Sequence, residues 1–197
     1  MEDYCTLKNK YKFGLMQKEE AEKVYESFDC IANNFDCINI LEIGVWNGET
    51  GTAFVKMAKN FGMNCNYFGI DTKKPEIKLL QEMKVIVGNA NNPEVVERLP
   101  RDLHFILVDA CHCFDCVVNQ FKIYSPLIVE NGIIAFHDTA ELVQGDPMSA
   151  SCDITKDKFI DVVTAIKSLD LSGFVLYREA KSGHGIKCYR KVSGENI

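Results

Sequence analysis

The chain has 197 residues, a formal net charge of −6 and a hydrophobic fraction of 47%. This length and composition predict one globular domain with a sizeable core. A negative balance without a long run of lysine or arginine argues against nucleic acid as a partner. The first residues are acidic and interleave charges, which fits neither a secretory signal nor a membrane span. We therefore expect a cytoplasmic protein that acts on a small molecule and does not bind a membrane.

The first forty residues predict one helix, from about residue 17 to residue 28. Glu19, Glu20 and Glu22 lie in its first turns, where negative charge suits the helix dipole. We expect residues 1–36 to form an N-terminal helical cover at the edge of a cofactor site.

The most informative stretch is an apolar run followed by two spaced glycines. Residues 38–41 predict a buried strand, and residues 52–58 predict the helix that follows. Gly44 and Gly48 lie in the turn between them, where a missing Cβ permits a sharp bend and the close approach of a ligand. Thr50 and the first N–H groups of the helix can meet polar ligand atoms. The turn therefore predicts a site for a nucleoside-bearing cofactor.

Strand-like and helix-like runs alternate along the rest of the chain, which predicts an α/β fold with a mostly parallel sheet and helices on both faces. The further expected parallel strands cover residues 66–70, 84–87, 104–108 and 132–136, and the further expected helices cover residues 93–99, 116–127 and 159–169. Residues 174–177 and 186–189 predict a C-terminal antiparallel strand pair. Together these runs predict a seven-stranded sheet in a single domain, residues 1–197.

Polar residues follow strand after strand, at the edge where open α/β sheets bind their ligands. Asp71 ends the second strand, 23 residues after Gly48. That spacing is close to the ~20-residue offset of an acid that binds ribose hydroxyls. Asn89, after the third strand, carries an amide that can pair with an adenine edge. Glu42 can anchor the turn or a cationic amino group.

Nine cysteines are scattered along the chain, an odd count that makes a poor disulfide framework and favours reduced thiols. Cys111, His112 and Cys113, followed by Cys116, have a spacing that can bind zinc. A structural zinc site usually takes two separated pairs of ligands, and a second pair is not visible. We therefore favour ordinary packing for these cysteines over a zinc site.

The pattern Glu42-x-Gly44-x-x-x-Gly48-x-Thr50, with Asp71 ending the next strand, resembles the class I S-adenosylmethionine-dependent methyltransferases. Residues 108–117 are similar to the Asp-Gly-x-His-x-Tyr-Glu-x-Val segment of a subgroup of small O-methyltransferases. Residues 126–138 are similar to its Pro-x-x-x-x-x-Gly-Gly stretch and the His-Asp pair that follows. The match is imperfect: Ala110 and Asn131 replace glycines, and Phe114 replaces a tyrosine.

The resemblance implies a Rossmann-like methyltransferase domain that binds S-adenosylmethionine. The expected cofactor-binding residues are Glu42, Gly44, Val45, Trp46, Gly48, Thr50, Asp71, Asn89, Ala90 and Asp109. The implied reaction is O-methylation of a hydroxyl on a small molecule or a sugar. A homodimer is a further expectation.

A hydroxyl acceptor must lose its proton during transfer. His112 and His137 are the candidate bases, because the ordinary pKa of histidine lies near working pH, and Asp109 is the third candidate catalytic residue. A divalent cation, Mg²⁺ or Mn²⁺, is the competing account. Related catechol-type enzymes hold such an ion at the positions that fall on Asp109, His137 and Asp138. Which account holds, and which histidine is the base, stays open at this point.

Two other readings of the chain remain. A nicotinamide-dependent oxidoreductase shares the strand, turn, helix and acid, but its Gly-x-Gly-x-x-Gly fingerprint is missing here. A catalytically inactive cofactor-binding subunit is the other alternative. Residues 141–158 are too long and irregular for an ordinary connector, so we expect a lid or a substrate loop there.

Overall fold

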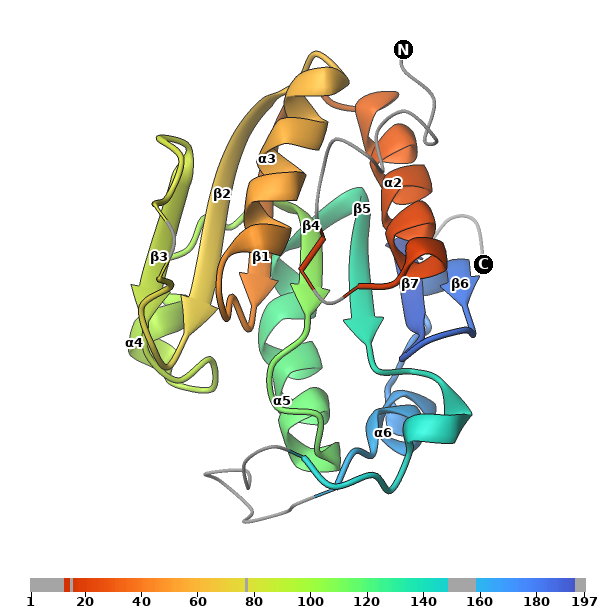
Figure 1. The fold of residues 1–197 in the computed structure, drawn as a ribbon. Coiled ribbons are helices and arrows are strands. Elements are labelled where there is room, and N and C mark those ends of the chain that lie inside the picture. Colours follow the sequence, from red (N-terminus) through yellow and green to blue (C-terminus); the bar gives the residue numbers. More distant parts are fainter. Residues whose placement is uncertain (1–12, 15, 77, 149–158, 194–197) are drawn as a thin grey trace.

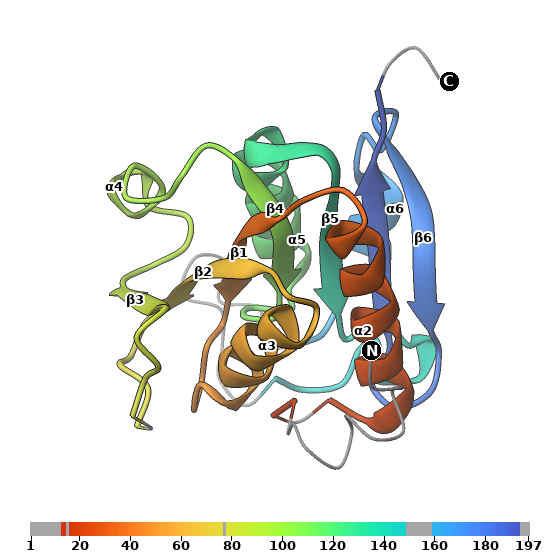
Figure 2. The ribbon, with the colours of Figure 1, turned by 90° about the horizontal axis from the view of Figure 1, so that it is seen from above.

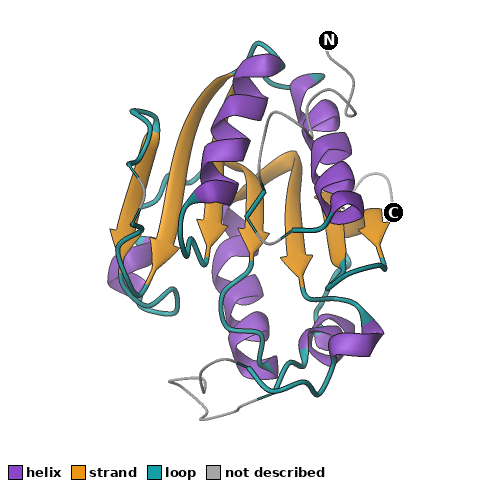
Figure 3. Cartoon of the chain, in the orientation of Figure 1, coloured by secondary structure: helices purple, strands orange, loops and turns teal. Residues whose placement is uncertain are grey.

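The computed structural model describes residues 13–14, 16–76, 78–148 and 159–193. A twisted sheet forms the central layer, and helices cover both of its faces (Figures 1 and 3). Within the described ranges, every helix is too short or too polar to cross a bilayer.

The sheet has seven strands in the order β3-β2-β1-β4-β5-β7-β6. Its strands are β1 (Cys37–Ile43), β2 (Asn64–Asp71), β3 (Met83–Val87), β4 (Leu103–Val108), β5 (Ile128–His137), β6 (Phe174–Ala180) and β7 (Ile186–Lys191). The first five pair in parallel, whereas β7 runs antiparallel to both β5 and β6. The predicted α/β class, the seven strands and the C-terminal antiparallel pair are confirmed.

Two helices, α2 and α3, cover one face of the sheet, and α4, α5 and α6 lie on the other, as the view from above shows (Figure 2). Their bounds are α2 (Lys18–Ala32), α3 (Glu49–Asn60), α4 (Pro93–Val96), α5 (Phe114–Tyr124) and α6 (Val162–Ser168). Short 3-10 helices follow α5 (η1, Ser125–Leu127) and β5 (η2, Glu141–Val143). The helix α2 packs against β5, β6, β7 and α3.

Most of the core lies in two apolar clusters, one on each face of the sheet. All six residues of β4 are buried, as expected for a strand that lies between β1 and β5 and is covered by helices on both faces. Burial on both faces explains why the central strands appear in the sequence as continuous apolar runs rather than as an alternation.

The helix expected over residues 159–169 begins later, at Val162. The backbone of Ile160 is bound instead to Gly145 and Asp146, with N···O distances of 2.7 and 2.9 Å, and Pro147 forms a bridge with Phe159. These contacts hold the two ends of the expected substrate loop together. Residues 149–158 of that loop lie outside the described residues.

Candidate functional site

The carboxyl ends of the five parallel strands meet at one edge of the sheet, the lower edge in Figure 1. The polar residues predicted from the sequence therefore lie along one edge. They form two groups, a turn after β1 and a cluster after β4 and β5.

Gly44 and Gly48 both have positive φ angles, 96° and 84°, so the turn after β1 uses the backbone freedom of glycine. A Cβ at Gly44 would lie only 2.0 Å from the carbonyl oxygen of Asp109. The backbone after β4 therefore lies directly against Gly44, which gives this glycine a packing role within the chain as well. Gly48 is the N-cap of α3, and its carbonyl accepts a hydrogen bond from the Thr52 N–H.

Asp71 joins the turn after β1 to the loop after β2. Its carboxylate accepts hydrogen bonds from the backbone N–H groups of Trp46, at 2.8 Å, and Lys73, at 2.9 Å. The Trp46 side chain is 62% exposed. The Asp71 carboxylate is thus held against the backbone of the turn, at the residue that carries the exposed indole.

Asn89 and Ala90 follow β3 and make local contacts. The Asn89 side-chain oxygen accepts a hydrogen bond from the Asn91 N–H at 2.9 Å, which closes a short turn. Ala90 is buried, and its carbonyl accepts a hydrogen bond from the Tyr124 hydroxyl at 2.5 Å.

Besides Ala90, three of the expected cofactor residues have buried side chains. Glu42 is 1% exposed and accepts a hydrogen bond from the Tyr67 hydroxyl. Burial raises the pKa of Glu42 well above its ordinary value, which favours a neutral carboxyl. Val45 is buried, and so is Thr50, which lies beside Gly14. Glu42 therefore supports the strand from within the core.

The second group is centred on the carboxylate of Asp138, a buried residue with a φ of 56°. One of its oxygens lies 2.5 Å from Nδ1 of His112 and 3.3 Å from Nδ1 of His137. Its other oxygen lies 2.7 Å from Nδ1 of His184. A single carboxylate thus contacts three histidines.

His137 lies between carboxylates on both sides of its ring. Its Nδ1 is 3.2 Å from an oxygen of Asp109, and its Nε2 is 3.3 Å from an oxygen of Glu20. Glu20 is completely buried and also accepts a hydrogen bond from the Gly185 N–H at 2.7 Å. The helix α2, far away in sequence, therefore supplies a charged group to the site.

The cluster shifts the pKa values of its members in opposite directions. Burial alone would lower the pKa of His137, but the charge of Asp109 and the hydrogen bonds around the ring raise it well above its ordinary value. For His112, burial is likewise outweighed by the hydrogen bond to Asp138, which raises its pKa. Burial would raise the pKa of Asp138, but its contacts with His112 and His137 hold it below its ordinary value.

Glu20 and His184 are the two members that sequence reasoning missed. Glu20 was interpreted as one of several charges in the first turn of a helix, and it does belong to a capping box with Gln17. His184 lies between two glycines in the turn after β6, where nothing in its local sequence marks it as a site residue. Both face partners that are 117 and 46 residues away in sequence. No local pattern in the sequence pairs them with the site.

The predicted metal ligands Asp109, His137 and Asp138 bring three donor atoms within 4.8 Å of one another. Neighbouring ligands of an octahedral ion, at bond lengths of about 2.1 Å, lie about 3 Å apart. The Nδ1 atom of His137 lies 3.2 and 3.3 Å from the two carboxylate oxygens, which fits that spacing. The hydrogen bond from Nε2 to Glu20 would hold the ring in the tautomer that leaves Nδ1 able to bind a metal. The residues present therefore fit a divalent cation.

The fold of the chain is similar to that of several solved structures. MycE, a methyltransferase from the mycinamycin biosynthetic pathway in complex with Mg, SAH and mycinamycin VI, is 17% identical with a TM-score of 0.68 over 99% of this chain. This chain spans only 56% of the MycE chain. CmcI with Mg and SAM is 20% identical with a TM-score of 0.50, over 65% of this chain and 56% of that one.

A third similar structure is the N-methyltransferase NodS from Bradyrhizobium japonicum WM9, 12% identical with a TM-score of 0.57, over 88% of this chain and 97% of NodS. At these identities the similarity shows a shared methyltransferase fold. A search of curated proteins found no match. The sequence model of a methyltransferase domain family matches residues 41–139, from within β1 to just after β5. The chain therefore belongs to this family of methyltransferase domains.

Proposed function

We propose that this chain uses S-adenosylmethionine to methylate a hydroxyl group on a small molecule or a sugar. The observation that carries the proposal is the sharing of one buried carboxylate, that of Asp138, by His112 and His137 at the carboxyl ends of β4 and β5. The similar structures of MycE and CmcI, whose names record Mg with SAH or SAM, support the cofactor.

The turn after β1 and the histidine cluster are adjacent, because the backbones of Gly44 and Asp109 are in contact. A cofactor held at the turn would thus have its reactive end near the cluster. Methyl transfer is an in-line displacement: the acceptor oxygen forms a bond to the methyl carbon as the carbon–sulfur bond breaks, and its electron pair stays on sulfur. The enzyme must align these atoms and remove the hydroxyl proton.

His112 is the base that this geometry favours. Its Nδ1 is committed to Asp138 at 2.5 Å, so Nε2 is the nitrogen that accepts the proton. The carboxylate would orient the ring and stabilise the imidazolium that forms, as in other base–carboxylate pairs. Because the pKa of His112 is raised, its basic form becomes more populated as the pH increases above the ordinary histidine range. His137 is enclosed by carboxylates and fits better as a positioning or ligating residue.

Asp109, His137 and Asp138 would hold a divalent cation at this site. When bound, such an ion lowers the pKa of a coordinated hydroxyl and orients it. Asp138 would then both bind the ion and hold His112. It is therefore required whether a base or a metal ion activates the hydroxyl.

Calorimetry with S-adenosylmethionine, S-adenosylhomocysteine and NAD tests the cofactor directly. We expect the first two to bind in the micromolar range and NAD not to bind. Binding of NAD alone would overturn the proposal in favour of an oxidoreductase. Binding of the methyl donor without transfer to any hydroxyl in a broad acceptor screen would favour an inactive cofactor-binding subunit.

Transfer assays with and without a chelator then separate the base from the metal. Activity that survives both the chelator and Asp138→Ala would exclude the cation. Loss of activity in His112→Ala, with cation binding unchanged by calorimetry, would identify His112 as the base.

A further inference from the structure

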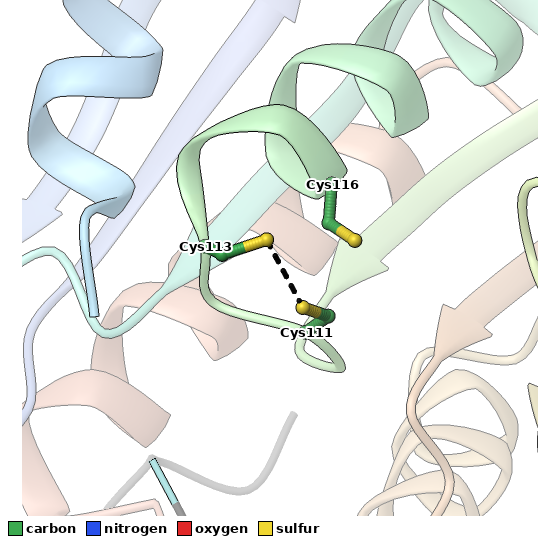
Figure 4. Close-up of side chains that lie close together, drawn as sticks. All are labelled: Cys111, Cys113 and Cys116. Atoms are coloured by element: carbon green, nitrogen blue, oxygen red, sulfur yellow. Dashed lines mark hydrogen bonds between the residues drawn. The ribbon is translucent and has the colours of Figure 1, made fainter. Parts of the chain in front are cut away.

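Three thiols converge where the loop after β4 enters α5, outside the site described above. Cys111 lies in the loop, Cys113 is the N-cap of α5, and Cys116 lies in its first turn. Their Sγ atoms all lie within 4.8 Å of one another, and those of Cys111 and Cys113 are 3.3 Å apart. Figure 4 shows the sulfurs of Cys111 and Cys113 facing each other, with Cys116 beside them on the helix. All three are thiols rather than halves of disulfides.

This spacing is that of ligands around one ion. At a metal–sulfur distance of about 2.3 Å, two thiolates of a tetrahedral ion lie about 3.8 Å apart and cannot exceed about 4.6 Å. The 3.3 Å between the sulfurs of Cys111 and Cys113 is close to the first value, and the Cys116 sulfur lies within 4.8 Å of both. Cys113 and Cys116 also have the Cys-x-x-Cys spacing that allows a turn to chelate an ion.

The surroundings favour a soft ion. Cys113 and Cys116 are almost completely buried, whereas Cys111 is partly exposed and provides a path of entry. The side chain of Met148, a thioether, packs against the cluster. The N–H groups at the start of α5 favour thiolates over thiols. Sulfur donors select Zn²⁺ or Cu⁺, whereas the oxygen donors of Asp109 and Asp138 suit harder ions.

We propose that Cys111, Cys113 and Cys116 together bind one thiophilic d10 metal ion, Zn²⁺ or Cu⁺, with each thiol releasing its proton. The missing second pair of cysteines, which argued against zinc in the sequence, is not required: three thiolates complete the shell of Cu⁺, and water can complete that of Zn²⁺. The ion would also fix the loop that carries His112, which lies between two of its ligands.

The test uses the full chain, reduced and stripped of metal, with excess Mg²⁺ present to occupy the oxygen-donor site. Zn²⁺ is titrated in competition with a chromophoric chelator, and Cu⁺ is titrated separately against bicinchoninate without oxygen. We expect one equivalent of one of these ions to bind with submicromolar affinity. The double variant Cys113→Ser/Cys116→Ser should weaken binding at least 100-fold.

Two controls make the result specific. The variant Cys37→Ser/Cys65→Ser changes two thiols near the amino ends of β1 and β2, at the opposite edge of the sheet. The variant Asp109→Asn/Asp138→Asn changes the other site. Both variants should bind the soft ion as the wild type does. A wild type that binds neither ion, or a Cys113→Ser/Cys116→Ser variant that binds equally well, would overturn the proposal.

Alkylation provides a readout that does not depend on a variant folding. In the wild-type chain, the bound ion should slow iodoacetamide labelling of the partly exposed Cys111 more than tenfold, as measured by mass spectrometry, whereas Mg²⁺ should not. Equal labelling with and without Zn²⁺ and Cu⁺ would contradict the assignment.

Discussion

The two parts of the site are built in different ways. The turn after β1 relies on its backbone: two glycines with positive φ, and the Trp46 N–H group, which binds the Asp71 carboxylate. The cluster after β4 and β5 relies on side chains, with three histidines around one buried carboxylate and a second buried carboxylate, Glu20, behind His137. The turn can be understood from one continuous stretch of chain, whereas the cluster requires the whole fold.

This difference has an energetic meaning. Charged groups are costly to bury unless they are paired, so the cluster is stable only while its partners remain together. The turn buries little charge. Its backbone has positive φ angles that are strained for most residues, and glycine adopts them without that strain. Changes in the cluster should therefore abolish chemistry, and changes in the turn should act on folding or on cofactor affinity.

The largest expected effect is that of Asp138→Asn. Asparagine tolerates the positive φ of this position, so the backbone should keep its conformation. The neutral amide cannot stabilise an imidazolium at His112, and we expect kcat to decrease about 10³-fold. Steady-state transfer assays measure this, with the exposed Asp146→Asn as the matched control. If Asp138→Asn kept more than a tenth of the wild-type rate, the central role of this carboxylate would be refuted.

Gly44→Ala should show that the turn depends on close backbone contact. The added Cβ would meet the Asp109 carbonyl at 2.0 Å in a positive-φ conformation, so we expect a loss of about 3 kcal/mol or more in the free energy of unfolding. Gly62→Ala is the control, because Gly62 also has a positive φ but nothing lies within 4 Å of its Cβ position. That variant should lose only about 1 kcal/mol. Equal losses in urea unfolding would mean that the contact after β4 is unimportant.

Glu20→Gln tests whether the carboxylate that α2 supplies to the cluster contributes to its function. The amide keeps the size of the side chain but removes the charge behind His137, and we expect cation affinity and transfer rate to decrease about 10- to 100-fold. The exposed neighbour provides the control, Glu19→Gln. Calorimetric titration with Mn²⁺ reports on the ion independently of activity. Wild-type affinity for Mn²⁺ in Glu20→Gln would show that this carboxylate serves folding alone.

Much of the fold could be predicted, because the sheet is buried on both faces and its strands are marked by apolar runs. The strand ends that carry Asp71, Asp109 and His137 were correctly located. The start of α6 was misplaced because Ile160, which is apolar and fits the helical period, uses its backbone for contacts with Gly145 and Asp146. A tertiary contact of this kind leaves no periodic signal in the sequence.

The site was predictable only where it is local. His112, His137 and Asp138 follow predicted strands, and parallel strand ends meet at one edge by geometry. Glu20 lies in α2, and His184 lies in the loop between β6 and β7. The positions of both elements depend on packing against the sheet. Gly44 illustrates a subtler limit: the sequence indicated the need for glycine, but the atom that requires it belongs to Asp109.

A smaller effect is expected from neutralising the two acids near the turn, Glu42 and Asp71, which should differ in their roles in stability and cofactor binding. Burial raises the pKa of Glu42, so this carboxyl ionises more readily in the unfolded chain than in the folded one. The resulting penalty on stability is absent below the ordinary carboxyl pKa and grows as the pH rises above it. Glu42→Gln should therefore raise the melting temperature at pH 7 by a few degrees, with the gain vanishing near pH 4. The affinity of Glu42→Gln for S-adenosylmethionine should stay within about twofold of the wild-type value, whereas Asp71→Asn should weaken cofactor binding about tenfold. Thermal melts across pH and calorimetry measure both, and destabilisation by Glu42→Gln at pH 7 would refute the neutral carboxyl.

The smallest expected effect is that of Trp46→Ala, which removes a large side chain while leaving the N–H bond to Asp71 in place. Because this indole is 62% exposed, its loss should change the free energy of unfolding by no more than about 0.5 kcal/mol. If the ring packs on the bound cofactor, affinity for S-adenosylmethionine should decrease about fivefold, equivalent to ~1 kcal/mol, and Trp46→Phe should recover most of it. A variant that loses stability but keeps its affinity would place the indole in the scaffold. The rim of the turn would then contribute to binding through its backbone alone.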